Sequence, residues 1–300
     1  MKWKGRRQST NVEDRRGQTS PGMGRGGFSP GMVGPLIKIL FSKTGLVIVG
    51  IFLVLSFVTG NNPLTLLGKL VGSGETLVNT SGPYQPTAEE EMLADFCATV
   101  LADTEDTWKI LLDNYREPTL VLFTNSVASA CGLASSATGP FYCPGDEKLY
   151  LDLSFFQEME DRLNAPGDFA QAYVIAHEVG HHIQKITGIM DQMQELRSRL
   201  SEKEYNQYSV KLELQADFLA GVWTHYTQSM NQILDEGDLE EALNAAYEIG
   251  DDRLQKKSTG HVLPDSFTHG TSKQRMYWFK KGFDTGDLAQ GDTFSDPSLL

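Results

Sequence analysis

The tract His177-Glu-Val-Gly-His181 has the residue types and the spacing of a metal-binding helix. Side chains four residues apart on a helix stand one turn above each other, so both imidazoles can bind one Zn²⁺ from the same side. Glu178 lies one step around the helix, where its carboxylate could accept a proton from water beside the metal. Apolar residues at 173–176 and at Ile183 flank the tract, and they favour a metal site over two hydrogen-bonded structural histidines.

Two acidic residues with the same spacing follow at Glu213 and Asp217. The small residues Ala216, Ala220 and Gly221 lie in the same stretch and would allow another helix to pack closely against it. Acidic side chains on such a surface are costly to bury unless they are paired. A metal ion and a histidine that binds the metal would satisfy both.

The elements that must position these residues are mainly helices. N-terminal helix signals, including capping boxes, begin at five residues: Thr87, Asp168, Ser201, Asp238 and Thr271. Strand patterns lie between the first and second helices, at residues 119–124 and 148–153, and a third short strand is expected within 139–143. This order of helix, strands and helices predicts an α+β fold with a short antiparallel sheet.

The pattern His177-Glu-x-x-His181 followed by Glu213-x-x-x-Asp217 resembles the gluzincin arrangement of zinc metallopeptidases. This resemblance implies a zincin-like body, with Glu213 as the third zinc ligand and Asp217 as the group that orients His177. The whole chain resembles the bacterial neutral zinc metallopeptidase family, which has a basic arm, one anchor and a periplasmic body. The matching stretches are residues 5–16, 139–144, the HExxH tract and 266–272.

His269 is a further candidate, because His269 and Arg275 are similar to a His-Pro-x-x-x-x-Arg segment of membrane-linked gluzincins, with Gly270 in place of the proline. His269 could steady the substrate carbonyl or the developing oxyanion. The alternative is a histidine that bonds loop or helix N-terminal groups. His182 is expected on the helix surface, and neither it nor His225 or His261 is expected to bind metal.

Charge and hydropathy divide the chain into a basic and an acidic part. The formal charge of −13 argues against nucleic acid as the main partner, yet residues 1–43 carry +7 and the rest −20. Residues 45–59 are uncharged, and with the apolar residues before them they predict a membrane anchor rather than a core helix or a cleaved signal peptide. The positive-inside rule then places the N-terminus in the cytoplasm and the body in the periplasm of a bacterial inner membrane, as a single-pass protein.

The expected organisation follows from this division. It comprises a disordered basic cytoplasmic arm at 1–35, a transmembrane anchor at 36–60, a linker at 61–86, a zinc metallopeptidase domain at 87–285 and a tail at 286–300. In an oxidising compartment Cys131 and Cys143 could form a disulfide, while Cys97 is expected to be a buried thiol.

The predicted function is zinc-assisted hydrolysis of peptide bonds in a peptide or protein substrate, with Glu178 as general base. Tyr150 and Asp152 could lie on an edge strand that pairs with the substrate backbone. The alternative function is that of a non-catalytic, membrane-anchored binding or chaperone-like protein with a structural or vestigial metal site.

Overall fold

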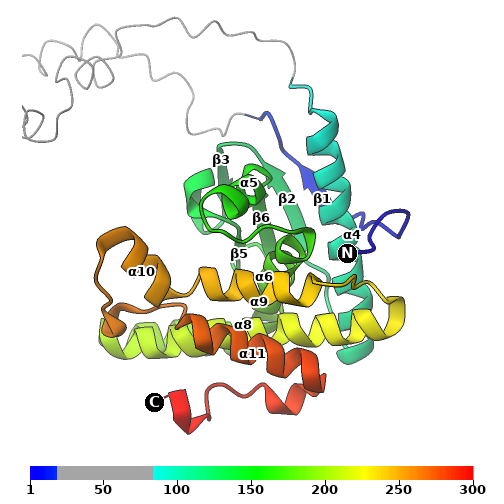
Figure 1. The fold of residues 1–300 in the computed structure, drawn as a ribbon. Coiled ribbons are helices and arrows are strands. Elements are labelled where there is room, and N and C mark those ends of the chain that lie inside the picture. Colours follow the sequence, from blue (N-terminus) through cyan, green and yellow to red (C-terminus); the bar gives the residue numbers. More distant parts are fainter. Residues whose placement is uncertain (19–83, 300) are drawn as a thin grey trace, which may run out of the picture. The chain divides into compact units, whose positions relative to one another are not determined.

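The computed structural model describes residues 1–18 and 84–299 of the 300-residue chain (Figure 1). Three of its long helices begin with capping boxes. In each, the Thr or Ser side chain accepts the backbone N–H of the residue three positions on, and the Glu or Gln side chain of that residue accepts the backbone N–H of the Thr or Ser. These three helices are α4 (Ala88–Leu111), α8 (Glu202–Asn231) and α11 (Ser272–Thr285).

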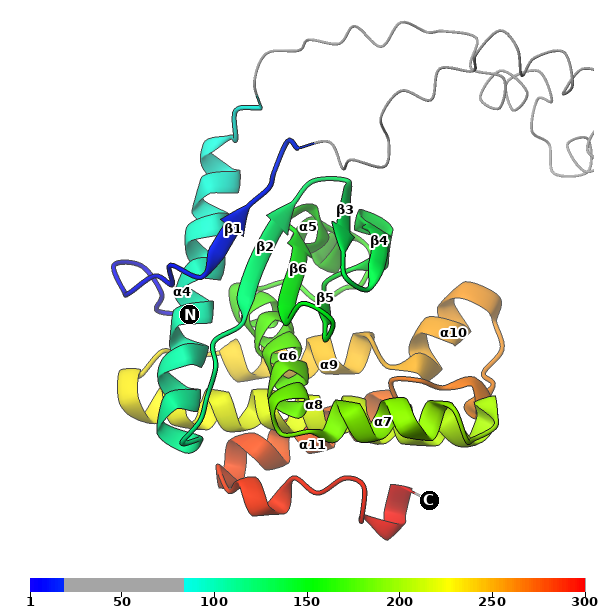
Figure 2. The ribbon, with the colours of Figure 1, turned by 180° about the vertical axis from the view of Figure 1, so that it is seen from behind.

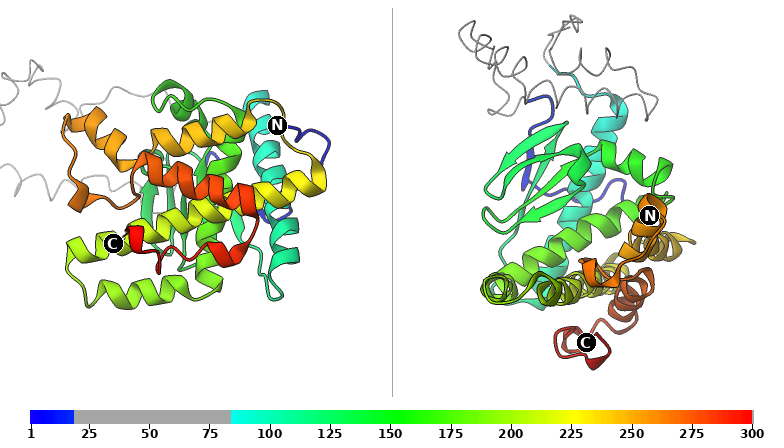
Figure 3. Two further views of the ribbon diagram at one scale, coloured as in Figure 1. Left: turned by 60° about the horizontal axis from the view of Figure 1, so that its bottom comes forward. Right: turned by 90° about the vertical axis from the view of Figure 1, so that its left-hand side faces the viewer.

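The remaining helices complete a mainly helical α+β fold, as the sequence predicts. They are α5 (Ser154–Asp161), α6 (Asp168–Ile186), α7 (Ile189–Arg197), α9 (Asp238–Glu248) and α10 (Asp251–Thr259). The helices α8, α9 and α11 gather on one side of the sheet, and α6 runs between them and the strands (Figure 3). Aromatic side chains fill the core between α6 and these helices, as in the stacked pair Phe169 and Trp223, whose ring centroids are 6.0 Å apart.

The sheet is mixed, so the antiparallel sheet expected from the sequence is wrong. Its order is β1-β2-β6-β5, in which β1 and β6 both run parallel to β2 and only β5 is antiparallel to its neighbour. The chain returns to the same end of the sheet between β2 and β6 through a separate hairpin, β3 with β4, and the short strand β5. The strands are β1 (Val12–Asp14), β2 (Thr119–Phe123), β3 (Ser126–Ser129), β4 (Gly132–Ser135), β5 (Phe141–Cys143) and β6 (Lys148–Asp152).

Strand β6 lies inside this sheet, between β2 and β5. Tyr150 and Asp152 are therefore on an interior strand and both are buried, which corrects their expected place at an edge. The edge strand of this region is β5, which pairs with β6 on one side.

Residues 1–18 are folded onto the body, so the expected disordered arm is wrong for this segment. Strand β1 extends the sheet beside β2 (Figure 2). Trp3 packs edge-to-face against Phe96 of α4. The Met1 α-ammonium group lies between carboxylates at the starts of α6 and α9, 2.8 Å from Asp168 and 3.3 Å from Asp238. The sequence could not predict this packing, because the partners of this polar segment are far away along the chain.

The expected anchor, and most of the linker and of the rest of the arm, lie outside the described residues. Among residues 1–18 and 84–299, no helix combines the length and apolar character needed to cross a bilayer. The C-terminal residues pack along α8 rather than forming a separate tail: the buried hydroxyl of Thr293 donates to the Lys211 carbonyl at 2.6 Å, and Gln215 donates to the Gly291 carbonyl at 3.0 Å.

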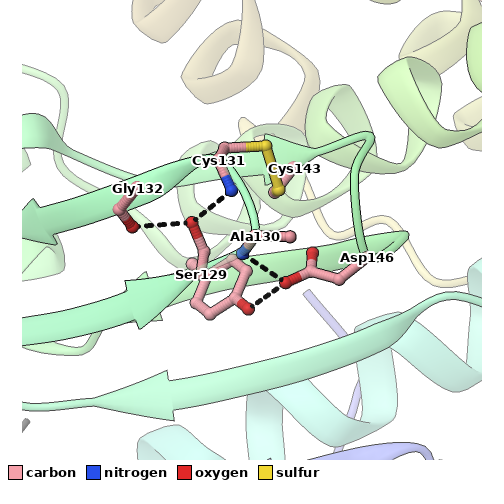
Figure 4. The surroundings of a disulfide bond; sticks show 7 residues. Ser129, Ala130, Cys131, Gly132, Cys143 and Asp146 are labelled. Atoms are coloured by element: carbon pink, nitrogen blue, oxygen red, sulfur yellow. Dashed lines mark hydrogen bonds between the residues drawn. A yellow bond between two sulfur atoms is a disulfide. The ribbon is translucent and has the colours of Figure 1, made fainter. Parts of the chain in front are cut away.

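Cys131 and Cys143 form a disulfide bond that joins the turn between β3 and β4 to the edge strand β5 (Figure 4). Asp146 supports the same corner, because its Oδ2 accepts bonds from the Ala130 N–H at 3.0 Å and the Tyr150 hydroxyl at 2.7 Å. The third cysteine, Cys97, is a free thiol and is fully buried in α4.

Candidate metal centre

Helix α6 presents His177 and His181 on successive turns of one face. Their ring centroids are 4.8 Å apart, and both residues are buried. Gly180, one residue before His181, allows α8 to approach, since a Cβ there would lie 3.0 Å from the Ala216 carbonyl oxygen. Glycine in a helix interior costs about 1 kcal/mol relative to alanine, and this close approach is what compensates for it.

Helix α8 carries the third member of the group, Glu213. Its two carboxylate oxygens lie 3.1 Å from Nε2 of His177 and 3.4 Å from Nε2 of His181. Ligand atoms from the three residues all lie within 4.8 Å of one another. Around a tetrahedral Zn²⁺ with bonds of about 2.0–2.2 Å, neighbouring ligand atoms are about 3.3 Å apart, so these donors fit a common ion.

Asp217 holds His177 from behind, one turn further along α8. The Nδ1–H of His177 donates to Oδ1 of Asp217 at 2.8 Å, which leaves Nε2 free to face Glu213. Asp217 is fully buried and also accepts bonds from the Tyr173 hydroxyl at 2.5 Å and from Nε and Nη2 of Arg275, each at 2.8 Å. The structure therefore adds Tyr173 and Arg275 to the residues that orient the group.

A glutamine plays the corresponding part for His181. Gln184 accepts a bond from the Nδ1–H of His181 at 2.8 Å, and its own amide donates to the Leu212 carbonyl at 2.7 Å and to Gln215 at 3.1 Å. Gln184 is not among the residues expected from the sequence, although its position one turn after His181 is a usable signal.

The pKa values of the histidines and of Glu213 show how the buried charges of this group are balanced. Burial by itself would lower the pKa of His177, but Asp217 and Glu213 outweigh it and raise that pKa to about 10. Burial likewise opposes ionisation of Glu213, yet His181 and His177 hold its pKa well below the ordinary value. The carboxylate is thus matched by positive charge on the imidazoles, and a divalent cation can replace the protons that they hold.

The three residues open into a cleft of about 510 Å³. Glu178 is half-buried and lines the cleft beside His177 and His181. Phe141 and Tyr142 of the edge strand β5 line the same cleft. The group is therefore accessible on the side on which Glu178 lies.

His269 also lines this cleft, from the loop between α10 and α11, and half of its side chain is exposed. Its Nδ1–H donates to Oδ1 of Asp251 at 3.2 Å, and this hydrogen bond is the main cause that raises the pKa of His269. The other oxygen of Asp251 accepts the backbone N–H groups of Thr268, His269 and Gly270, at 2.7, 2.6 and 3.1 Å. Asp251, which the sequence reading did not single out, therefore fixes both the loop and the imidazole.

His182 is fully buried, so its expected place on the helix surface is wrong. The strand β5 and the segment after α4 cover this side of α6: the Tyr142 hydroxyl donates to Nδ1 of His182 at 3.0 Å, and the Nε2–H donates to the Arg116 carbonyl at 2.6 Å. Burial lowers the pKa of His182, in keeping with a neutral ring that bonds on both sides. His225 donates from Nδ1 to the Phe283 carbonyl at 2.8 Å and His261 is exposed, and neither belongs to the metal group.

Two histidines one turn apart, a glutamate from a second helix and a carboxylate behind the first histidine define a site of the HExxH type. The chain belongs to the family described as "Putative neutral zinc metallopeptidase", whose family model matches residues 1–294. It is similar to "Uncharacterized protein YpfJ" of Escherichia coli K12, with 47% identity over 298 residues that cover 98% of this chain and 99% of the relative.

A more distant similarity extends to mycobacteria. "Uncharacterized protein Rv2575" of Mycobacterium tuberculosis is 41% identical over 202 residues, which cover 64% of this chain and 67% of the relative. "Uncharacterized protein Mb2605" of Mycobacterium bovis matches with the same identity and coverage. No solved structure matches the chain.

Proposed function

We propose that the protein is a zinc metallopeptidase that hydrolyses peptide bonds in a peptide or protein substrate. The observation that carries this proposal is the convergence of His177, His181 and Glu213 at 3.1–3.4 Å beside a cleft that Glu178 lines. Zn²⁺ bound by these three residues would supply a Lewis acid that lowers the pKa of water and polarises the scissile carbonyl.

Glu178 would move the proton of the reaction. Its carboxylate, on the side of α6 that faces the cleft, accepts a proton from the attacking water and then donates it to the amine that leaves. A single group can serve both steps because the proton stays on the same carboxylate between them. General acid–base catalysis of this kind contributes about 10²- to 10⁴-fold to the rate.

His269, which also lines the cleft, would support the reaction. With Nδ1 held by Asp251, its Nε2–H is free to donate to the oxygen that gains negative charge as the carbonyl is attacked. The raised pKa of His269 keeps this donor protonated to higher pH than an ordinary histidine. Asp251 acts here as a positioning residue.

The strand β5 offers a place for the backbone of an extended peptide. Among the described strands it stands at the edge of the sheet, it lines the cleft, and its outer side could accept a further strand by main-chain hydrogen bonds. A substrate held in this way would lie across the face of α6 that carries Glu178.

The alternative is a binding or chaperone-like protein with a structural or vestigial metal site. Structural zinc sites are usually closed by four protein ligands. The group of His177, His181 and Glu213 has three members and opens into a cleft, which favours catalysis.

The proposal is tested with the full-length protein and a mixture of quenched fluorescent peptides. Glu178→Gln should keep bound zinc and lose hydrolysis, whereas Glu213→Gln should lose both. Glu160→Gln, a change at an exposed glutamate of α5, is the matched control and should behave as the parent. Normal turnover by pure, zinc-loaded Glu178→Gln protein would refute the mechanism, and zinc-loaded parent protein without any hydrolysis would favour the alternative.

We further propose that the protein is associated with a membrane through the apolar segment 36–60, which lies outside the described residues. The bond between Cys131 and Cys143 supports a body that matures in an oxidising compartment, such as the bacterial periplasm. Fractionation of cells that express the full chain, with thiol trapping of these two cysteines, tests both statements.

A further inference from the structure

The N-terminal segment, residues 1–18, is built into the body by main-chain hydrogen bonds. Strand β1 pairs with β2 in a defined parallel register, from Val12 opposite Leu120 to Asp14 opposite Leu122. The pairing continues on both sides, where the Leu120 N–H donates to the Asn11 carbonyl at 2.9 Å and the Arg15 N–H donates to the Leu122 carbonyl at 2.8 Å. The Ser9 N–H donates to the Ala98 carbonyl of α4 at 2.9 Å. The segment is thus a strand of the central sheet.

The arginines of this segment form ion pairs with acidic residues. Arg6 forms a two-pronged pair with Asp103 of α4, with distances of 2.6 and 2.7 Å, and Asp103 is almost fully buried. Arg7 pairs with Glu105 at 2.9 Å and with Asp106 at 2.7 Å. Arg15 pairs with Glu13, and Arg16 with Asp14 and Glu91.

These contacts give the basic residues of the N-terminal segment a structural role. Read as sequence, its lysines and arginines predict retention in the cytoplasm by the positive-inside rule. In the fold, Arg6, Arg7 and Arg16 instead pair with acidic groups of α4, two of which, Asp103 and Glu105, are buried. Buried carboxylates without these partners would be left uncompensated, so the body requires the segment beside it.

The residues on the two sides of the undescribed stretch 19–83 also contact each other. Arg16 donates from Nη1 to the Glu90 carbonyl at 3.0 Å and from Nη2 to the Glu91 carboxylate at 3.0 Å. A chain that crossed a membrane once between residues 18 and 84 would separate these groups by the thickness of the bilayer. We infer that residues 1–18 and 84–299 occupy the same compartment, in place of the cytoplasmic N-terminus and periplasmic body expected from the sequence.

Cysteine labelling of the full-length protein in spheroplasts tests this inference. Gln8→Cys and Ile110→Cys introduce thiols at exposed positions of the N-terminal segment and of α4. The parent chain is the background control, because its free Cys97 is buried and its other two cysteines are bonded. A membrane-impermeant maleimide should label both variants to the same extent before permeabilisation and again after it. Labelling of one variant before permeabilisation and of the other only after it would overturn the inference.

A cross-link measures the contact itself, without any need for peptidase activity. Arg7→Cys with Asp106→Cys places two thiols where an exposed ion pair of 2.7 Å stands. A short bifunctional maleimide should join them. After cleavage at a protease site inserted between residues 18 and 84, the two fragments should then run together on a denaturing gel. Arg7→Cys with Leu133→Cys, on the distant strand β4, is the control pair that should not be joined (Figure 2). Two reactive thiols at 7 and 106 that never cross-link would contradict the shared compartment.

Discussion

The replacement Asp217→Asn removes the carboxylate charge that pairs with Arg275 of α11 and orients His177 of the metal group. Asp217 is fully buried, accepts four hydrogen bonds from Tyr173, His177 and Arg275, and has a pKa that the charges of Arg275 and His177 lower to about 2 against the effect of burial. Asparagine has nearly the same shape, so the change tests charge and hydrogen bonding rather than packing. Its amide N–H groups must face at least one of these donors.

Two losses of different size follow from the structure. Arg275 is 3% exposed and would keep its charge without a carboxylate, and breaking a buried pair in this way costs about 3–5 kcal/mol of unfolding free energy. His177 would lose the acceptor that holds its Nδ1–H and directs Nε2 toward Glu213. Loss of such a support lowers metal affinity by about 10- to 100-fold.

The two effects can be separated by one further change. In the double variant Asp217→Asn with Arg275→Met, the unpaired buried charge is gone, so part of the unfolding free energy should return, while zinc affinity should stay low. Chemical denaturation of the zinc-free protein measures the first quantity and competition with a chromogenic chelator measures the second. Unchanged stability and unchanged zinc affinity in Asp217→Asn would refute the reasoning, as would recovery of zinc affinity in the double variant.

Two further predictions concern groups outside the metal site. Tyr142→Phe leaves Nδ1 of the buried His182 without its donor, so the unfolding free energy should fall by about 1–3 kcal/mol in a denaturant titration while zinc affinity is unchanged; an unchanged titration curve would contradict the role of this bond. Acid should release the N-terminal segment first. A hydrogen bond from Lys148 is the main cause that lowers the pKa of Glu13, and Arg16 lowers the pKa of Asp14. The stabilisation from these two carboxylates is therefore present above their ordinary pKa values of 4.5 and 3.8 and is lost as pH falls through the folded-state pKa values. Hydrogen exchange, corrected for intrinsic rates, should then rise in residues 1–18 before it rises in α8, and simultaneous release of both would argue against it.

Much of the body could be predicted because its signals are local. A capping box joins residues three positions apart, and the i, i+4 spacing of His177 with His181 and of Glu213 with Asp217 is a property of a single helix. The strand patterns also predicted the places of β2, β5 and β6. They could not predict their directions, because an apolar strand alternates in the same way in a parallel and in an antiparallel pair.

The sequence by itself determined the helical α+β class, the HExxH tract and the second acidic pair, since each follows from residue types at short spacing. Only the tertiary structure decided which partners those residues have: Arg275 on Asp217, Asp251 on His269, and Tyr142 on His182. The same holds for the N-terminal segment, whose basic composition predicts a disordered arm. Arg6 and its partner Asp103 are 97 residues apart, and no local pattern records a contact made only when the chain packs.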